Sequence, residues 1–465
     1  MIRLLCLVVL VMPGALLVGL ALAADFLGLG RSGSGGFGTR QTGLLVVGLL
    51  MLLYAALVDR KAAKDRRASG RSYFKTVLFL VVPTLVVLGV SLIVADRVIG
   101  LVQSPGCPTA GVNFPPNSTT TIETSEFSFT IESNSIGIRD REPVARQDAG
   151  YRVLAIGDSF TYGWGVAQDQ TWPKVVEGRL RTTGRRAEVL NLGYPGASPR
   201  KYVTIAREAI PLLKPDLVLV GILQGNDLKQ LDLEDSDRRF LADLWLQWFF
   251  PNFVRVRDGR CFQKPEKNSA AGIKAQWQEA ARQLQQTADP VARQRFDQLD
   301  PQVRQTLLAG NLNPCAVELA IRDPDFYAFT LHDERPEVQA ATATLAACLG
   351  EICRVARRVG AKVEVVSVPS GAYVCRSSWR TIRRLGFSLD EDVLDDDRPD
   401  GPIQAACEQA GVTFHSVMSQ VRQAAEGEGL FFELDDHFNP RGQAVYGEAV
   451  ADLILQRKIG ERQAA

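Results

Sequence analysis

The chain has 465 residues, a formal net charge of +1 and 46% hydrophobic residues. This length allows two or three structural units. Because the net charge is close to zero and no basic stripe stands out in the polar part of the chain, the composition disfavours nucleic-acid binding.

Apolar residues are concentrated in the first hundred positions. Three segments, at 4–24, 42–58 and 76–95, are nearly free of charge and are about long enough to cross roughly 30 Å of hydrocarbon as helices. We therefore expect about three transmembrane helices within residues 1–103. The first segment could instead be a cleaved signal peptide, and the second, which is the shortest, could be a buried core helix.

The loop between the second and third segments is rich in Lys and Arg. Short basic loops are retained in the cytoplasm, so we expect a multi-pass protein of the cytoplasmic membrane with the rest of its chain on the periplasmic or extracellular side. Seven of the eight cysteines lie in this outer part, where an oxidising compartment permits disulfides. Cys348 and Cys353 lie five positions apart on one expected helix, which argues against a bond between them; the other pairings stay open.

The outer part begins with a proline-rich stretch. Residues 104–150 are expected to form an extended linker and then a half-buried strand at 126–132, where polar and apolar residues alternate. From residue 151 onward, short apolar runs alternate with helical stretches. The runs lie at 153–156, 189–192, 217–222, 363–368 and 412–414.

This alternation predicts an α/β domain at 151–465 with a doubly wound, flavodoxin-like parallel sheet. The interval at about 231–340 is too long for a simple crossover, so we expect a helical insertion there. Its densest aromatic cluster, at 244–250, is interpreted as a packed helix face, with a lid or a lipid-contacting surface as alternatives.

A serine follows the first apolar run directly, in Gly157-Asp158-Ser159. A strand that ends at this point places Ser159 at the carboxyl end of the sheet, in the turn before a helix, where its hydroxyl can act as a nucleophile. Taken alone, the tripeptide is more often a helix cap. Thr161 stands where an α/β-hydrolase elbow has glycine, which disfavours that fold.

Two further turns follow neighbouring strands. Gly196 lies in the glycine turn after the second strand, and Asn226 lies in Gln224-Gly225-Asn226-Asp227 after the third. Backbone amides and a side-chain amide that meet at one sheet edge can stabilise a developing oxyanion. With the amide of Ser159, these groups form the expected oxyanion hole.

A nucleophilic serine needs a base, and the chain has three histidines: His332, His415 and His437. His437 is the best candidate because it lies just before a helix and has a carboxylate, Asp435, two positions upstream. Asp436 is the reserve choice for the carboxylate. The spacings CxxC and HxxxH are absent, so we expect no metal site.

Gly157-Asp158-Ser159, Gly196, Asn226 and Asp435-x-His437, in this order, resemble the four blocks of the SGNH/GDSL hydrolase family over roughly residues 152–455. Gln224 departs from the pattern, because the family has glycine there. The Asp-x-His spacing is similar to that of alginate-type polysaccharide O-acetyltransferases. The segment 134–140 resembles the lead-in of membrane-anchored bacterial members, and we interpret it as structural.

The resemblance implies a serine esterase or deacylase that acts on acyl esters, above all O-acetyl esters, of envelope glycans or lipids, with a Ser159–His437–Asp435 triad and no cofactor. An O-acyltransferase to a cell-surface polysaccharide, served by a membrane acyl-donor partner, is the first alternative. A non-catalytic glycan-binding scaffold is the second. The sequence leaves the substrate, the acyl length and the oligomeric state open.

Overall fold

The computed structural model describes residues 39–63, 92–97, 116–233, 267–426 and 429–456, together with isolated positions between 11 and 89 and at 250. By its internal contacts the chain divides into two compact units, Met1–Val102 and Gln103–Ala465. The aromatic cluster at 244–250 lies outside the described residues apart from Phe250.

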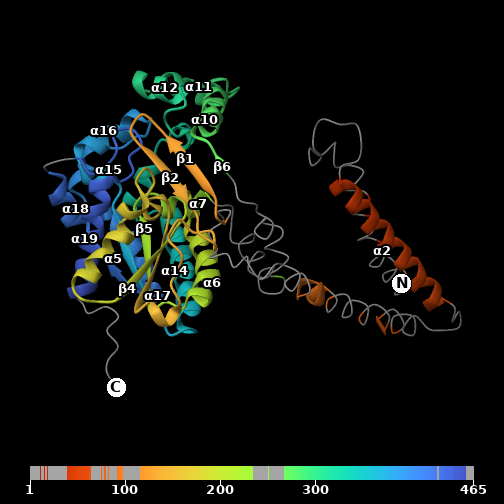
Figure 1. Ribbon diagram of the computed structural model, residues 1–465. Coiled ribbons are helices and arrows are strands. Elements are labelled where there is room, and N and C mark those ends of the chain that lie inside the picture. Colours follow the sequence, from red (N-terminus) through yellow and green to blue (C-terminus); the bar gives the residue numbers. More distant parts are fainter. Residues whose placement is uncertain are drawn as a thin grey trace. The chain divides into compact units, whose positions relative to one another are not determined.

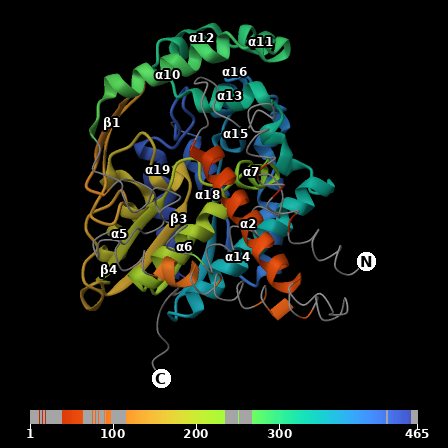
Figure 2. The ribbon, with the colours of Figure 1, turned by 90° about the vertical axis from the view of Figure 1, so that its right-hand side faces the viewer.

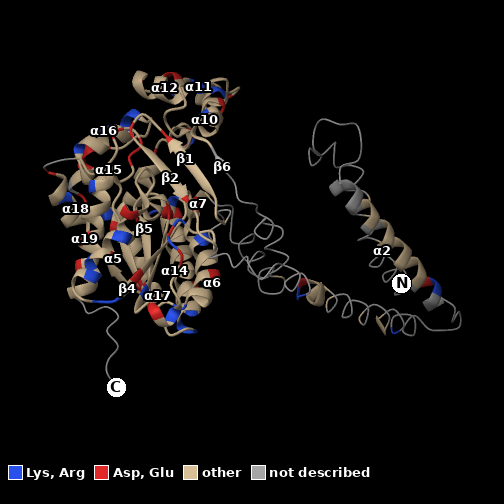
Figure 3. Cartoon of the chain, in the orientation of Figure 1, with Lys and Arg blue, Asp and Glu red and all other residues tan. Residues whose placement is uncertain are grey.

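In the first unit, the second predicted segment lies within one helix, α2 (Thr39–Ala63). The middle of α2 carries no charged residue (Figure 3), and several of its large apolar side chains are exposed, among them Leu49, Leu50 and Leu53. Most residues of the first and third predicted segments lie outside the described part. Among the residues that are described, none of the helices is both long enough and apolar enough to cross a membrane, so the three predicted spans are not confirmed.

The second unit contains the predicted parallel sheet. Its strands lie in the order β4-β3-β5-β7-β8, and every adjacent pair is parallel. The strands are β3 (Tyr151–Gly157), β4 (Ala187–Gly193), β5 (Leu217–Leu223), β7 (Lys362–Val368) and β8 (Thr413–His415). The first four strands each contain one predicted apolar run, β8 contains the fifth run except for Val412, and the order is the flavodoxin-like 2-1-3-4-5. The predicted α/β fold class is confirmed.

Helices cover both faces of the sheet (Figure 1). One layer consists of α5 (Trp172–Thr182), α18 (Met418–Ala425) and α19 (Pro440–Gln456). The other consists of α6 (Pro199–Leu213), α14 (Pro336–Arg357) and α17 (Gly401–Ala410). Successive strand residues point to opposite faces: Val153 and Ala155 of β3 join the core under the first layer, and Leu154 and Ile156 join the core under the second. Burial on both faces explains why the strands are continuous apolar runs.

The chain crosses from one side of β3 to the other after β4, because β4 and β5 lie on opposite sides of β3. In sheets of this kind, ligands bind at the carboxyl ends of the strands where the direction of winding changes. Three short helices start at these ends: α4 (Ser159–Tyr162) after β3, α7 (Asp227–Leu233) after β5 and α15 (Gly371–Val374) after β7.

From residue 270 onward, the predicted insertion between β5 and β7 is helical. Its elements are α10 (Ala270–Gln285), α11 (Pro290–Asp297), α12 (Pro301–Leu308), α13 (Pro314–Arg322) and the 3-10 helix η3 (Phe326–Leu331). Helices α11, α12 and α13 each begin with an Asp or Asn cap followed by proline, as helix starts favour. Figures 1 and 2 both place α10–α12 at the same end of the second unit as α16 (Arg376–Arg384).

A small sheet precedes the parallel sheet. It consists of β1 (Thr119–Glu123), β2 (Ser128–Glu132) and the short β6 (Lys267–Asn268), in the order β2-β1-β6. Strand β2 covers most of the strand expected at 126–132, whereas β1 lies in the stretch that we expected to be a linker. Ile122, Phe129 and Ile131 of this sheet share a small core with Tyr162 and Trp164, which follow Ser159. The hairpin is therefore packed against the segment that carries the candidate nucleophile.

The remaining 3-10 helices are η1 (Arg146–Asp148), η2 (Gln168–Gln170), η4 (Glu391–Asp395) and η5 (Arg398–Asp400). No disulfide joins the cysteines in the described part, which lie at 315, 348, 353, 375 and 407.

Candidate active site

Ser159 is the first residue of α4 and lies at the carboxyl end of β3. The preceding Asp158 caps this helix, because its carboxylate accepts a hydrogen bond of 3.0 Å from the amide of Phe160. Gly157 allows the strand to turn closely against the helix: a Cβ at this position would lie 2.1 Å from the Thr161 hydroxyl oxygen. The glycine and the aspartate of the Gly-Asp-Ser motif thus shape the turn that presents Ser159.

His437 and Asp435 approach Ser159 from the turn before α19. The Ser159 hydroxyl lies 2.7 Å from His437 Nε2, and His437 Nδ1 lies 2.5 Å from Asp435 Oδ1. Because the carboxylate can only accept, Nδ1 carries the proton and Nε2 is free to accept from Ser159. The structure brings the three predicted residues together in the order that a serine nucleophile requires.

Two opposing effects set the pKa of His437. Burial disfavours the charged ring and lowers the pKa, while the Asp435 carboxylate and its hydrogen bond favour the charged form; the net pKa lies above the ordinary value of 6.5. The neighbouring Asp158 has its pKa raised to about 6, chiefly by burial. Asp435 therefore stabilises the imidazolium that would form when His437 accepts a proton.

The side-chain contacts of the two carboxylates decide between Asp435 and Asp436. Asp435 Oδ1 contacts His437 Nδ1, whereas Asp436, whose φ of 61° is left-handed, has its carboxylate beside Ser378. It is buried against Gly371, and one of its carboxylate oxygens has no hydrogen-bond partner in the part of the chain that is described. Burial raises the pKa of Asp436 well above its usual range. Asp436 is therefore not the histidine's partner.

The other two histidines lie elsewhere. His415 is buried at the end of β8 and pairs with Glu364 of β7, at 2.6 Å. His332 lies at the end of η3 in the insertion, 3.5 Å from Glu334. Neither of them has a hydrogen bond to Ser159.

The predicted oxyanion donors follow the two strands that flank β3. Gly196 lies in the turn after β4 with a φ of 72°. Asn226 lies between β5 and α7, and its side-chain oxygen is buried without a partner among the described residues. The amide of Ser159 begins α4, and a first helical amide has no acceptor within its own helix. These donors lie at the carboxyl ends of the strands, as the Ser159 hydroxyl does.

Gln224, which stands at the family's glycine position, is a buried anchor for the Asn226 turn. Its side-chain amide donates to Ser367 Oγ at 3.1 Å and to Asp400 Oδ1 at 2.6 Å. The next residue, Gly225, has a φ of 74°, and a Cβ there would lie 2.4 Å from the Tyr373 hydroxyl oxygen. The substitution of Gln for Gly therefore ties this turn to β7 and to the start of α17.

Sequence reasoning missed two residues that contact the Asp435 turn. Trp164 donates its indole N–H to Asp435 Oδ2 at 3.3 Å, and the Glu126 carboxylate accepts hydrogen bonds from the backbone of the turn. The contacts join residues 271 and 309 positions apart, so no local sequence pattern could have predicted them.

The lead-in segment has the structural contacts that its position suggested. Arg139 is almost fully buried and donates to the carbonyl oxygens of Tyr162 and Gly163, both at 2.9 Å, and of Val166 at 2.5 Å. These bonds hold the segment that follows Ser159. Burial lowers the pKa of the Arg139 guanidinium.

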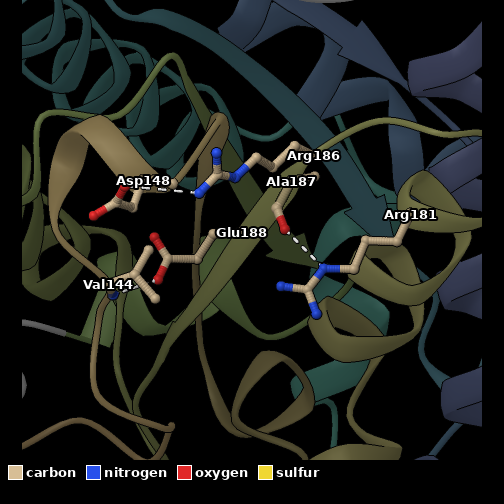
Figure 4. Close-up of a pocket in the computed structure, with 7 residues that line it drawn as sticks. Val144, Asp148, Arg181, Arg186, Ala187 and Glu188 are labelled. Carbon is tan, nitrogen blue, oxygen red and sulfur yellow. Dashed lines mark hydrogen bonds and ion pairs between the residues drawn. The ribbon is translucent and has the colours of Figure 1, made fainter.

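A separate pocket of about 300 Å³ opens at the opposite, amino end of the sheet (Figure 4). It is lined by Val144, Asp148, Ala149, Arg181, Arg186, Ala187 and Glu188. Since Ala187 and Glu188 begin β4, this pocket is remote from the carboxyl ends where Ser159 lies. Within the described ranges, no three His, Cys, Asp or Glu residues are grouped so that they could hold a metal ion.

Comparison with solved structures finds similar chains of low identity. TesA is 12% identical with a TM-score of 0.32, and the match covers 65% of this chain and 97% of that one. A catalytic mutant of Axe2, an acetylxylan esterase from Geobacillus stearothermophilus, is 13% identical with a TM-score of 0.31, covering 67% and 96%. The psychrotrophic esterase EstA from Pseudoalteromonas sp. is 8% identical with a TM-score of 0.31, covering 66% and 98%. With TM-scores this low, none of these similarities says anything about substrate or mechanism.

No curated protein matches the chain. The sequence model of the GDSL-like lipase/acylhydrolase family, in contrast, matches residues 155–445, which is well over half of the chain. This range includes Ser159, Gly196, Asn226 and the Asp435–His437 turn. The protein belongs to the GDSL-like lipase/acylhydrolase family.

Proposed function

We propose that the protein is a serine esterase or deacylase in which Ser159, His437 and Asp435 form the catalytic triad. The hydrogen bond between the Ser159 hydroxyl and His437 Nε2, with Asp435 on the other ring nitrogen, carries this proposal. Membership of an ester-cleaving family supports it.

The reaction begins when Ser159 Oγ attacks the ester carbonyl carbon and His437 Nε2 takes the hydroxyl proton. The carbonyl oxygen becomes an oxyanion and accepts hydrogen bonds from the amides of Ser159 and Gly196 and from the side-chain amide of Asn226. Each such donor contributes about 3 kcal/mol in the transition state. His437 then protonates the leaving alcohol, and water, deprotonated by the same histidine, releases the acid from the acyl-enzyme.

We further propose that the substrates are acyl esters, above all O-acetyl esters, of envelope glycans or lipids, and that the active domain is held at the outer side of the cytoplasmic membrane. Three apolar segments before residue 96 and the basic loop between the second and third of them support this location. Mass spectrometry of envelope glycans and lipids from a deletion strain tests the substrate: acyl groups that accumulate on one component identify it.

The triad is tested with an activated acetyl ester and a fluorophosphonate probe on the full chain. Ser159→Ala should abolish turnover and labelling, and His437→Ala should abolish labelling while leaving the fold intact. Ser128→Ala, at an exposed serine of β2, is the matched control and should behave as the wild type. Turnover retained by Ser159→Ala would refute the proposal, and a wild-type chain that is never labelled would instead favour a non-catalytic scaffold.

Product analysis separates hydrolysis from transfer. With an acetyl donor and a polysaccharide acceptor in water, free acetate as the main product supports the esterase. Acetylated acceptor with little free acetate would replace it with the O-acyltransferase.

A further inference from the structure

Glu126 lies in the turn between β1 and β2, outside the matched family region. Its side chain nevertheless contacts the turn at 432–437 that carries Asp435 and His437, here called the catalytic turn. Its carboxylate accepts hydrogen bonds from three successive backbone amides. Oε1 accepts from Glu433 at 2.5 Å and from Leu434 at 3.0 Å, and Oε2 accepts from Leu434 at 3.0 Å and from Asp435 at 2.9 Å. Consecutive amides that converge on one anion form a strong anion-binding site.

The segment bound in this way is the one that carries the triad carboxylate and base. The turn is closed by a hydrogen bond of 2.9 Å from the Phe432 amide to the His437 carbonyl. Thr381 donates its hydroxyl to the carbonyl of Glu433 from the other side, at 2.5 Å. The amide of Asp435 is bound by Glu126 while its side chain holds His437, so the two contacts act on one residue.

The Glu126 backbone is itself fixed. The Thr124 hydroxyl accepts from the amides of Glu126 and Phe127, both at 3.1 Å. The Phe127 ring packs against the Phe432 ring with centroids 4.7 Å apart. The neighbouring Ser125 donates its amide to the carbonyl of Asn311 in the helical insertion, at 3.2 Å. These contacts fix the hairpin turn and thereby the position of the Glu126 carboxylate.

We propose that Glu126 is a positioning residue for catalysis: its carboxylate holds the turn at 433–435 so that Asp435 keeps the His437 ring aligned with Ser159. This inference rests on the proposed triad. It makes the β1–β2 hairpin a part of the active enzyme, although this hairpin precedes the region matched by the family model.

A glutamine at this position preserves the size of the side chain and changes its hydrogen bonding. Glu126→Gln keeps one acceptor oxygen but turns an NH₂ group toward backbone amides that are donors themselves, so at least one amide loses its partner. Glu126→Ala removes every contact. Glu132→Gln, at an exposed carboxylate of the same hairpin, is the matched control.

Steady-state kinetics with the activated acetyl ester give the first readout. We expect kcat to fall about 10-fold in Glu126→Gln and about 100-fold in Glu126→Ala, since small misplacements of a catalytic group have effects of this size. KM should change little, because the hydrogen bonds of the Glu126 carboxylate within the described residues go to the backbone amides at 433–435. Glu132→Gln should match the wild type.

The pH profile gives a readout that a merely structural role would not move. The Asp435 carboxylate raises the pKa of His437. When Asp435 is held less firmly, that pKa falls, so the acid limb of kcat/KM should shift to lower pH in Glu126→Gln.

The inference is overturned if both Glu126 variants keep the wild-type kcat and the acid limb of their kcat/KM profile does not shift. If Ser159→Ala is inactive in the same assay, the proposed triad is unaffected by that result. A lowered melting temperature with lost activity but an unmoved acid limb would also overturn it, in favour of a purely structural contact. If Ser159→Ala were active, the proposed triad itself would fail.

Discussion

Asp435→Asn tests the tautomer that the structure assigns to His437. Asp435 accepts from two donors, His437 Nδ1 at 2.5 Å and Trp164 Nε1 at 3.3 Å. Asparagine has one acceptor oxygen and one NH₂ donor, so it cannot satisfy both. Since the indole nitrogen can only donate, the amide oxygen is drawn to Trp164 and the NH₂ group faces His437.

In that arrangement Nδ1 must accept, and the ring proton moves to Nε2, the nitrogen that faces Ser159. His437 then cannot take the serine proton. In serine enzymes this wrong tautomer costs about 10⁴-fold in kcat, or about 5 kcal/mol of transition-state stabilisation, and we expect a loss of that order.

Trp164→Phe adds a second test in the same background. It keeps an aromatic ring in the small core with Phe129 but removes the competing donor, so the asparagine oxygen is free to face Nδ1–H. The double variant should therefore be more active than Asp435→Asn alone, by at least about 10-fold. A double-mutant cycle of kcat values for the activated ester measures this coupling.

Asp436→Asn is the matched control, because asparagine tolerates the left-handed backbone of that position. It should keep kcat within about threefold, in the range of a neutral substitution. A severe loss in Asp436→Asn with normal activity in Asp435→Asn would show that the carboxylates had been assigned in the wrong order. The tautomer argument is refuted if the fold-loss of kcat in the double variant equals the product of the fold-losses in Asp435→Asn and Trp164→Phe.

Three other outcomes are expected. Asn226→Ala should lower kcat for the activated ester about 10²- to 10³-fold with little change in KM, as the loss of one oxyanion donor does. Because His437 must be neutral to accept a proton and its pKa is raised, kcat/KM of the wild type should begin to fall on acidification at a pH above 6.5; a midpoint below 6.5 would contradict this. Gln224→Leu removes a buried donor to Asp400 and should lower the free energy of unfolding by about 1–3 kcal/mol, measured by denaturant titration, with Gln404→Leu on the exposed side of α17 as the control.

Much of the fold and of the candidate site could be predicted because it depends on local patterns. A strand buried on both faces must be a continuous apolar run, so the five strands of the sheet were recognisable one by one. The turn residues Gly157 and Gly225 are glycines because the side chains of Thr161 and Tyr373 leave no room for a Cβ at these strand ends. The role of Ser159 could be predicted from the strand that precedes it, and that of His437 from its position just before the last helix.

Other features depend on contacts between distant parts of the chain. The role of Asp435 rather than Asp436 is decided by contacts that the two identical side-chain types do not reveal: Asp435 lies on His437 Nδ1, whereas Asp436 is buried against Gly371. Strand β1 was not expected, because its threonines follow a proline-rich stretch. It is stabilised by pairing with β2 and by the shared core of Ile122, Phe129 and Trp164.

The same distinction applies to the catalytic turn. The Asp-x-His spacing is local and visible in the sequence, but the groups that hold it, Glu126 and Trp164, lie about 270–310 residues earlier. Sequence alone determined which groups can perform the chemistry, because side-chain type and strand-end position suffice for that. Only the tertiary structure decided their alignment, because alignment depends on hydrogen bonds across the fold, which have no periodicity along the chain.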